Sequence, residues 1–386
     1  MDRDNTVIGN PDPGRTASAG GAATGQPPRV WLVVGDKLGD NAQVEIVADV
    51  LGWPVERKVM RFLPQYQTGK PPFKPSLYHI DAAASAALEP PWPDLVLTVG
   101  RRPSMAAMWI KLQAAGRTKV VIVGRPRRML RDFDLVLATP QYRLPDRGNV
   151  LRLDLPLMRI DAAKIEAAAG AWQERLGGMA RPLTAVLVGG PTKPFIFDDG
   201  VARAFLSSLD ETTRGQGSLF ITTSRRTPPG VVAALEADLP AGSRLFRWSA
   251  EATDNPYQAL LGLADRFVVT GDSVSMLVEV ARTGKPLAIF ALPTEGGVWP
   301  GLKKKLAEVF QPPAGGGNAG PLARFGDLLY DAGLIGYSRE FEAVHRALFD
   351  GGFAVPLGRP FAAAQGRAPD DLPQVAARIR QLFTLG

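Results

Sequence analysis

The sequence predicts an α/β protein of two Rossmann-like domains with a cleft between them, and three observations support this. The chain has 386 residues, more than one hydrophobic core usually serves. Short apolar, β-branched segments alternate with segments of helical spacing, a pattern typical of a parallel sheet covered on both faces. This alternation occurs twice, on either side of an Ala-rich helical segment near the middle of the chain.

The first domain is predicted over residues 30–158. It opens with an apolar strand at 30–34, a Gly-containing polar turn at 35–41 and a helix at 43–51. A second helix is predicted at 104–115. The other predicted strands are short apolar runs at 94–99, 120–123, 135–138 and 150–153.

A connector helix is predicted within residues 159–180, where helical spacing ends at two glycines. The second domain, 181–325, has predicted strands at 184–188, 219–222, 245–248, 266–270 and 287–290. Residues 326–386 are expected to form helices that pack on both domains. Residues 1–29, rich in Gly, Pro and Ala, are expected to be a disordered tail.

The composition excludes several classes of protein. The chain has no Cys and only two His, so thiol chemistry is excluded and no metal site is predicted. No apolar run approaches the roughly 18 residues of a membrane-spanning helix, and the cytoplasm is the expected location. The net charge is +7, but no aromatic platform or helix-turn-helix pattern indicates a nucleic-acid partner.

Basic residues are concentrated in residues 101–131, which hold nine Lys or Arg and no Asp or Glu. This run could contact an anionic acceptor, or place the protein peripherally at the inner face of an anionic membrane. A solvated surface is the other interpretation.

Polar residues follow the predicted strands, at the edge of a parallel sheet where ligands usually bind. After strand 266–270 the chain reads Gly271, Asp272, Ser273 and then Ser275, at the start of a helix whose free N–H groups could hold a diphosphate. Glu279 lies on the same helical face as Ser275, about 6 Å further along, where it could reach ribose hydroxyls. The alternative is that Asp272 or Ser273 only caps the helix and Glu279 is solvated.

Two further loops of the second half carry candidate donor-binding residues. Ser224, Arg225, Arg226 and Thr227 offer two guanidiniums and two hydroxyls to a phosphate, although the arginines could instead face water or an interdomain carboxylate. Gly189 and Gly190 would allow close backbone approach, without a Walker or GxGxxG spacing. In the first half, Asp36 or Asp40 could act as general base or simply cap the helix.

These motifs resemble the mitochondrial-fission "elongated mitochondria" family, whose bacterial members are similar to glycosyltransferases of the GT-B type. The resemblance covers about residues 30–340. Its most specific part is Ser-Arg-Arg-Thr-Pro at 224–228 together with Thr-Gly-Asp-Ser-Val-Ser-Met at 270–276; Gly-Arg-Arg at 100–102 and Gly-Gly-Pro at 189–191 also match. One departure lies in the first turn, where the family carries a His before Gln43 and this chain has Asp40-Asn41-Ala42, so that Asp40 would replace it or the activity would differ.

The resemblance implies a GT-B-like fold and transfer of a sugar from a nucleotide-sugar to a lipid or glycan acceptor. The nucleotide-sugar is then a donor substrate, and no separate cofactor or metal is expected. Asp36 or Asp40 would deprotonate the acceptor. A non-catalytic adaptor that keeps the fold and acts at a membrane surface is the alternative.

Overall fold

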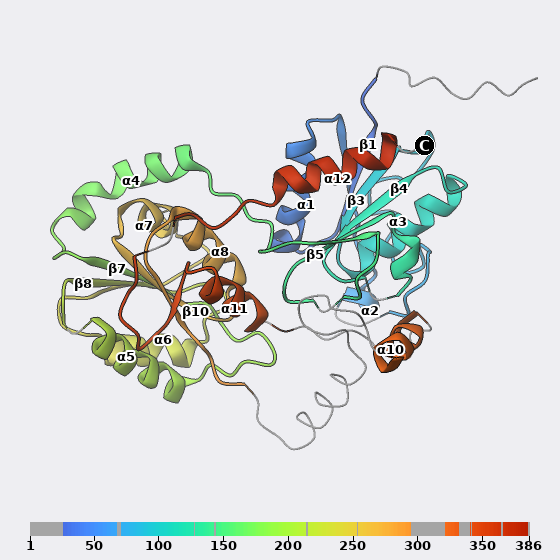
Figure 1. The fold of residues 1–386 in the computed structure, drawn as a ribbon. Coiled ribbons are helices and arrows are strands. Elements are labelled where there is room, and N and C mark those ends of the chain that lie inside the picture. Colours follow the sequence, from blue (N-terminus) through green and yellow to red (C-terminus); the bar gives the residue numbers. More distant parts are fainter. Residues whose placement is uncertain are drawn as a thin grey trace, which may run out of the picture.

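The computed structural model describes residues 26–67, 71–126, 128–142, 144–213, 215–252, 254–294, 321–331, 340, 342–363 and 366–384. They form two six-stranded parallel sheets with interleaved helices, arranged as two Rossmann-like domains side by side (Figure 1). The predicted fold class is therefore confirmed. Residues 1–25, most of the predicted tail, lie outside the described residues.

The first sheet has the strand order β2-β1-β3-β4-β5-β6, and all its pairings are parallel. Its strands are β1 (Val30–Val34), β2 (Val55–Val59), β3 (Leu95–Val99), β4 (Lys119–Val123), β5 (Leu135–Ala138) and β6 (Val150–Arg152). Its helices are α1 (Leu38–Leu51), α2 (Pro64–Gln67) and α3 (Arg101–Gln113), with a 3₁₀ turn at Leu130–Asp132.

Five of these strands were predicted, and β2 was not. The central strands are buried on both faces and are therefore apolar throughout, which makes them visible in the sequence. β2 is an edge strand with the sequence Val-Glu-Arg-Lys-Val, and its first three side chains are exposed. Charged side chains are tolerated on an edge strand, so no apolar run marks it.

The second sheet has the order β12-β11-β10-β7-β8-β9, again with parallel pairings. Its strands are β7 (Leu183–Leu187), β8 (Ser218–Thr222), β9 (Arg244–Phe246), β10 (Arg266–Thr270), β11 (Leu287–Phe290) and β12 (Val355–Pro356). Its helices are α4 (Ala162–Gly177), α5 (Asp199–Thr213), α6 (Pro229–Ala237), α7 (Tyr257–Leu263) and α8 (Val274–Thr283).

If the strands are numbered from β7 as 1 to β12 as 6 and the sheet is read from β9, the order is 3-2-1-4-5-6. This is the strand order of dinucleotide-binding domains. The order of connection reverses between β7 and β10, which are neighbours in the sheet. Ligands of such sheets bind beyond the carboxyl ends of the strands at this reversal. The loops that follow β7 and β10 are therefore the expected ligand-binding loops of the second domain.

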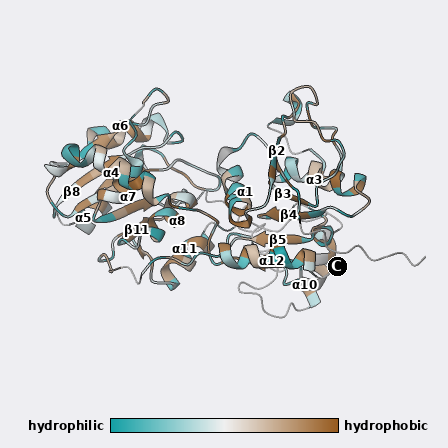
Figure 2. Cartoon of the chain, turned by 90° about the horizontal axis from the view of Figure 1, so that it is seen from above, coloured by the Kyte–Doolittle hydropathy of each residue, from teal (hydrophilic) through white to brown (hydrophobic). Residues whose placement is uncertain are grey.

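Apolar side chains cover both faces of each sheet, and Figure 2 shows the central strands in the hydrophobic colour. The predicted connector helix, α4, packs in the second domain, where Trp172 and Leu176 join the core beside α7. α11 (Glu342–Asp350) also packs there, through Val344 and Leu348.

Two other C-terminal helices return to the first domain. α10 (Pro321–Asp331) places Tyr330 in its core, and the Tyr330 hydroxyl donates to the Pro126 carbonyl. α12 (Leu372–Thr384) packs against α1 (Figure 1). Just before α12, the Asp371 carboxylate accepts the N–H groups of Asp154 and Leu155 at 3.0 and 3.3 Å.

Candidate functional site

The loops after β7, β8 and β10 meet around the carboxylate of Asp272. Its Oδ2 accepts the Gly190 N–H at 2.9 Å and the Arg226 guanidinium at 3.3 Å, and its Oδ1 accepts the Thr270 hydroxyl at 2.8 Å. Thr270 in turn accepts the Gly189 N–H at 2.8 Å. The structure thus brings together three loops that are separated by up to 82 residues in the sequence, at the reversal point of the second sheet.

The Asp272 side chain is fully buried, whereas that of Arg226 is 44% exposed. Burial raises the pKa of the Asp272 carboxyl, and the Gly190 N–H, the Thr270 hydroxyl and Arg226 partly offset this. Both carboxylate oxygens are bonded to the protein itself. Asp272 therefore organises the loops from within, and α8 begins without a side-chain cap.

Gly189 and Gly190 are needed for contacts within the protein. A Cβ on Gly189 would lie 2.4 Å from Asp272 Oδ2, and one on Gly190 would lie 2.0 Å from the Arg226 carbonyl oxygen. Only glycine lets these backbones come so close. The close approach predicted for a phosphate is used here by neighbouring loops.

Ser224 and Thr227 shape the turn after β8. The Thr227 hydroxyl donates to the Gly189 carbonyl at 2.6 Å and accepts the Ser224 N–H at 2.8 Å. The Ser224 hydroxyl lies 3.1 Å from that of Thr227 and accepts the Arg226 N–H at 3.3 Å. The two hydroxyls therefore hold the turn, and the Arg226 guanidinium also donates to Thr192 of the first loop.

Other polar groups at this edge face outward. Arg225 is exposed, and no described residue pairs with its guanidinium. Ser275 is also exposed, in the first turn of α8. Ser273, in contrast, is buried and precedes α8 without making a side-chain cap. The first N–H groups of a helix have no intrahelical acceptor. Arg225, Ser275 and the start of α8 are therefore the groups available to an anion.

Glu279 is half-buried on α8 and accepts a hydrogen bond from the Tyr257 hydroxyl of α7. Burial raises the pKa of the Glu279 carboxyl, and the bond from Tyr257 partly offsets this. The same burial, with Glu279 beside it, raises the pKa of Tyr257 well above its ordinary value. Tyr257 engages one carboxylate oxygen, Oε2, and holds Glu279 in place.

His345, on α11, belongs to this region although the sequence did not indicate it. Its Nε2 lies 2.7 Å from the Gly271 carbonyl oxygen, which can only accept, so Nε2 carries the proton. Burial lowers the pKa of His345 despite the nearby carboxylates of Glu342 and Asp272. A Cβ on Gly271 would lie 2.6 Å from the ring, so Gly271 leaves room for His345. No local motif surrounds His345, and only its tertiary contact reveals it.

The two aspartates proposed as bases lie in the first domain. Asp36 is exposed in the turn between β1 and α1, and Asp40 lies in the first turn of α1, where its side chain falls outside the described residues. No described hydrogen bond or ion pair joins Asp36 to the Asp272 loops. Their neighbour Asn41 is buried and donates to the Gly35 carbonyl at 2.9 Å, which fixes this turn.

The carboxyl ends of the two sheets are close to each other. The Glu340 N–H donates to the Gln141 carbonyl, just after β5, at 2.8 Å, and five residues later His345 contacts Gly271. Five residues span at most about 17 Å, so the loops after β5 and β10 border one region. A cavity of about 80 Å³ opens on the first-domain side, lined by Gln43, Gly100, Gly124 and Gln141 among others.

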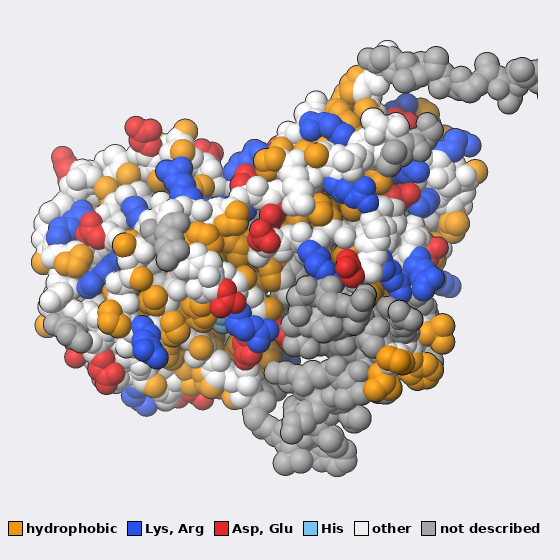
Figure 3. Space-filling view, in the orientation of Figure 1, with side chains coloured by type: hydrophobic (Ala, Val, Ile, Leu, Met, Phe, Trp, Pro, Cys, Tyr) orange, Lys and Arg blue, Asp and Glu red, His pale blue; other side chains and the backbone are white. Residues whose placement is uncertain are grey.

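Several cations of the basic run 101–131 are engaged within the protein itself. Arg101 and Arg102 begin α3 and donate to the backbone carbonyls of Pro71 and Gln67. Towards the other end of α3, Lys111 pairs with Asp134 at 2.6 Å, and Lys119 lies 3.7 Å from the same carboxylate. On the face of the molecule drawn in Figure 3, Lys and Arg side chains are interspersed with other side chains. Arg127 lies outside the described residues.

Among the residues that the structure describes, no three His, Asp or Glu side chains are grouped so that they could hold a metal ion. None of the helices described is both long and apolar enough to cross a bilayer.

Comparison with solved structures gives distant similarities. A UDP-GlcNAc 2-epimerase from Methanocaldococcus jannaschii aligns over 93% of this chain and all of its own, with 9% identity and a TM-score of 0.46. A glycosyltransferase from Rickettsia africae aligns over 84% and 97% of the two chains, with 10% identity and a TM-score of 0.43.

Sequence comparison gives nearer relatives. The mitochondrial fission protein ELM1 of Arabidopsis thaliana is 29% identical over 220 residues, 51% of either chain. An uncharacterized protein of Rickettsia prowazekii is 27% identical over 234 residues, 52% of this chain and 65% of that one. The matches thus span about half to two thirds of these relatives. The model of the family described as mitochondrial fission ELM1 matches residues 39–309, well over half of the chain. The chain therefore belongs to the mitochondrial fission ELM1 family.

Proposed function

We propose that this protein is a glycosyltransferase that binds a nucleotide-sugar at the carboxyl end of the second sheet and transfers the sugar without a metal ion. The observation that carries the proposal is the position of the Asp272 loops at the reversal between β7 and β10, the ligand-binding point of this strand order. A lipid or glycan acceptor would approach from the first domain.

Each outward-facing group has a role in this proposal. The N–H groups at the start of α8, with the Ser275 hydroxyl, would bind the diphosphate, and Arg225 would offset the charge that develops on it as the sugar departs. Arg226 is tied to Asp272 and Thr192, and it would act from the edge of the site. Glu279, held by Tyr257, would accept hydrogen bonds from the ribose.

The acceptor hydroxyl must lose a proton, and Asp36 or Asp40 would take it, since both lie at the carboxyl edge of the first sheet. Asp36 is exposed at that edge. The protein itself would be peripheral to the inner face of a membrane if the acceptor is a lipid.

The first test is calorimetric titration of UDP, GDP, CMP, ADP and their sugars into the wild type and two variants, Arg225→Ala and Glu279→Gln. We expect saturable binding of one nucleotide, weakened about tenfold or more by each substitution, because charge-assisted hydrogen bonds are lost. Glu279→Gln keeps an acceptor for Tyr257.

Arg117→Ala and Glu236→Ala are the matched controls, because both side chains are exposed and distant in the fold from the Asp272 loops. They should leave affinity within about twofold. If no nucleotide binds to the folded wild type, the proposal fails, and the non-catalytic adaptor becomes the better description.

A further inference from the structure

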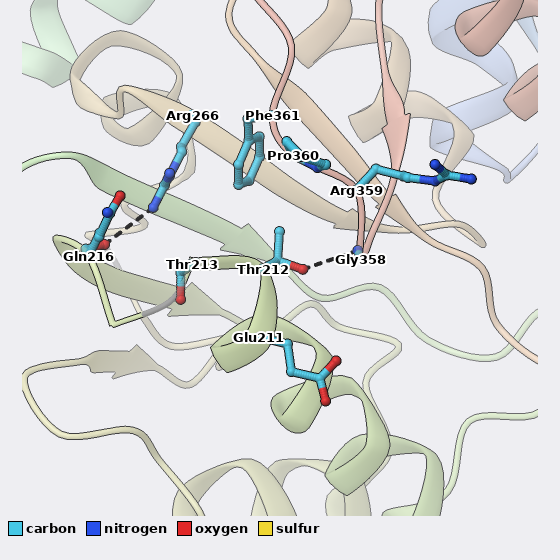
Figure 4. Close-up of a pocket in the computed structure, with 9 residues that line it drawn as sticks. All are labelled: Glu211, Thr212, Thr213, Gln216, Arg266, Gly358, Arg359, Pro360 and Phe361. Atoms are coloured by element: carbon cyan, nitrogen blue, oxygen red, sulfur yellow. Dashed lines mark hydrogen bonds between the residues drawn. The ribbon is translucent and has the colours of Figure 1, made fainter.

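A second cavity, of about 280 Å³, lies in the second domain at the end where the strands begin. Gln216 precedes β8 and Arg266 is the first residue of β10, whereas the Asp272 loops follow the last residues of these strands. The end of α5 and the turn after β12 complete the walls (Figure 4). Its size suits a small ligand.

Of the three charged residues that line this cavity, Arg266 is half-buried, whereas Glu211 and Arg359 are exposed. Its guanidinium stacks on the Phe361 ring, 4.7 Å from the ring centre. Its Nε donates to the Thr184 hydroxyl at 2.8 Å and its Nη2 to the Gln216 carbonyl at 3.2 Å, and both of these acceptors are neutral.

Asp265, the neighbour of Arg266 in the chain, is already occupied. Asp265 accepts the Arg181 guanidinium at 2.9 Å and the Leu183 N–H at 2.6 Å. Arg266 is half-buried, and among the described residues no carboxylate forms an ion pair with it. Burial lowers the pKa of the Arg266 guanidinium, and the charge of Asp265 offsets only part of this. A partly buried guanidinium that is hydrogen-bonded only to neutral groups favours an anion.

The two threonine hydroxyls of the lining are engaged within the protein. The Thr212 hydroxyl donates to the Ser208 carbonyl at 2.7 Å and accepts the Gly358 N–H at 3.1 Å, and the Thr213 hydroxyl donates to the Leu209 carbonyl at 2.9 Å. An anion in this cavity would therefore depend on Arg266 for its charged donor. Arg359 and Glu211 are exposed, and Figure 4 shows the Arg359 side chain extending away from Arg266. Phe361 and Pro360 add an apolar wall.

We propose that this cavity binds a phosphate group, held by the Arg266 guanidinium, with any organic body attached to the phosphate resting against Phe361. The site is separate from the Asp272 loops and does not depend on the proposed transferase activity. Free phosphate and a phosphate monoester share the chemistry that Arg266 recognises.

The test is a titration of the full chain with inorganic phosphate at constant ionic strength. Binding is measured by calorimetry and by the shift in melting temperature. We expect saturable binding that Arg266→Gln weakens about tenfold, because the stacked guanidinium supplies the charge-assisted contacts. Arg203 is an exposed arginine of α5, the helix whose end lines the cavity, and Arg203→Gln should leave phosphate binding unchanged. Glycerol 3-phosphate is the second probe. If it binds more tightly than phosphate and Phe361→Ala removes part of that gain, the ligand is a phosphate ester. If the two probes bind equally tightly, the ligand is the free phosphate ion.

Three outcomes would overturn the proposal. Binding could fail to saturate, it could persist in folded Arg266→Gln, or it could be lost in Arg225→Ala instead, which would assign the phosphate to the Asp272 loops. If Arg266→Gln does not fold, Arg266→Lys keeps the charge but not the stacked, planar donors, and it should bind several-fold more weakly. Unchanged binding by that variant would equally reject the site.

Discussion

Asp272 and His345 illustrate, at the scale of single residues, how one contact can place a loop. Asp272 joins the three strand-end loops, and His345 fixes α11 against the carbonyl of Gly271. Each is buried, so each has a displaced pKa: that of Asp272 is raised and that of His345 is lowered. Their contributions to the free energy of unfolding therefore change with pH in opposite directions.

For His345 the direction follows from linkage. Its folded pKa lies below the ordinary value of 6.5, so in the range between the two the unfolded chain binds more protons. Its contribution to stability is thus present at higher pH and is lost as pH falls below about 6.5. We expect urea unfolding from about pH 7.5 to about pH 5.5 to show a smaller loss of stability in His345→Gln than in the wild type.

His79 serves as the comparison, because burial also lowers its pKa and its Nε2 lies 2.9 Å from the Arg102 carbonyl oxygen. A His79→Gln variant should remove a separate part of the pH dependence. If His345→Gln retained the full wild-type slope, the ring would not be held in its neutral form by α11 packing.

At the scale of elements, Gly271 in the turn between β10 and α8 allows α11 to pack closely against this turn. Gly271→Ala would place a Cβ 2.6 Å from the His345 ring and 3.2 Å from the Phe290 carbonyl oxygen. We expect a loss of about 1–3 kcal/mol in the free energy of unfolding, since α11 must move away. Denaturant unfolding measures this loss.

Gly230→Ala is the matched control, because nothing lies within 4 Å of a Cβ built there, in the first turn of α6. This variant should be as stable as the wild type or up to about 1 kcal/mol more stable, since alanine favours the helix. Equal stability of the two alanine variants would show that α11 docking does not depend on Gly271.

The elements also show how much could be predicted from sequence. Buried central strands such as β3 and β10 have apolar, β-branched runs that predict them, and the strand-end rule located the loops at Gly189, Ser224 and Gly271. The charged edge strand β2 has no such pattern. The roles of Asp272 and Gly190 depend on a contact across 82 residues, which local spacing does not contain.

At the scale of the whole molecule, Asp371 fixes the return of the chain to the first domain. Its carboxylate accepts two N–H groups from the segment that leaves β6. Asp371→Ala would leave the buried Leu155 N–H unpaired, at a cost of about 1–3 kcal/mol, and would release the more exposed Asp154 N–H to water at a smaller cost. We expect a lower melting temperature and faster proteolytic cleavage between β12 and α12.

Asp350→Ala is the control for that experiment, because Asp350 is exposed at the end of α11 and no described residue pairs with its carboxylate. Its melting temperature and cleavage pattern should match those of the wild type. Identical cleavage in Asp371→Ala would mean that α12 packing alone secures the return.

The backbone passes between the domains once after β6, again between β11 and α10, again at Glu340 and finally between β12 and α12. Two domains joined by a single linker can rotate relative to each other about many axes. When several segments join them at separate points, fewer axes of rotation remain. An opening movement for a ligand would therefore have to bend the chain at each of these crossings at once.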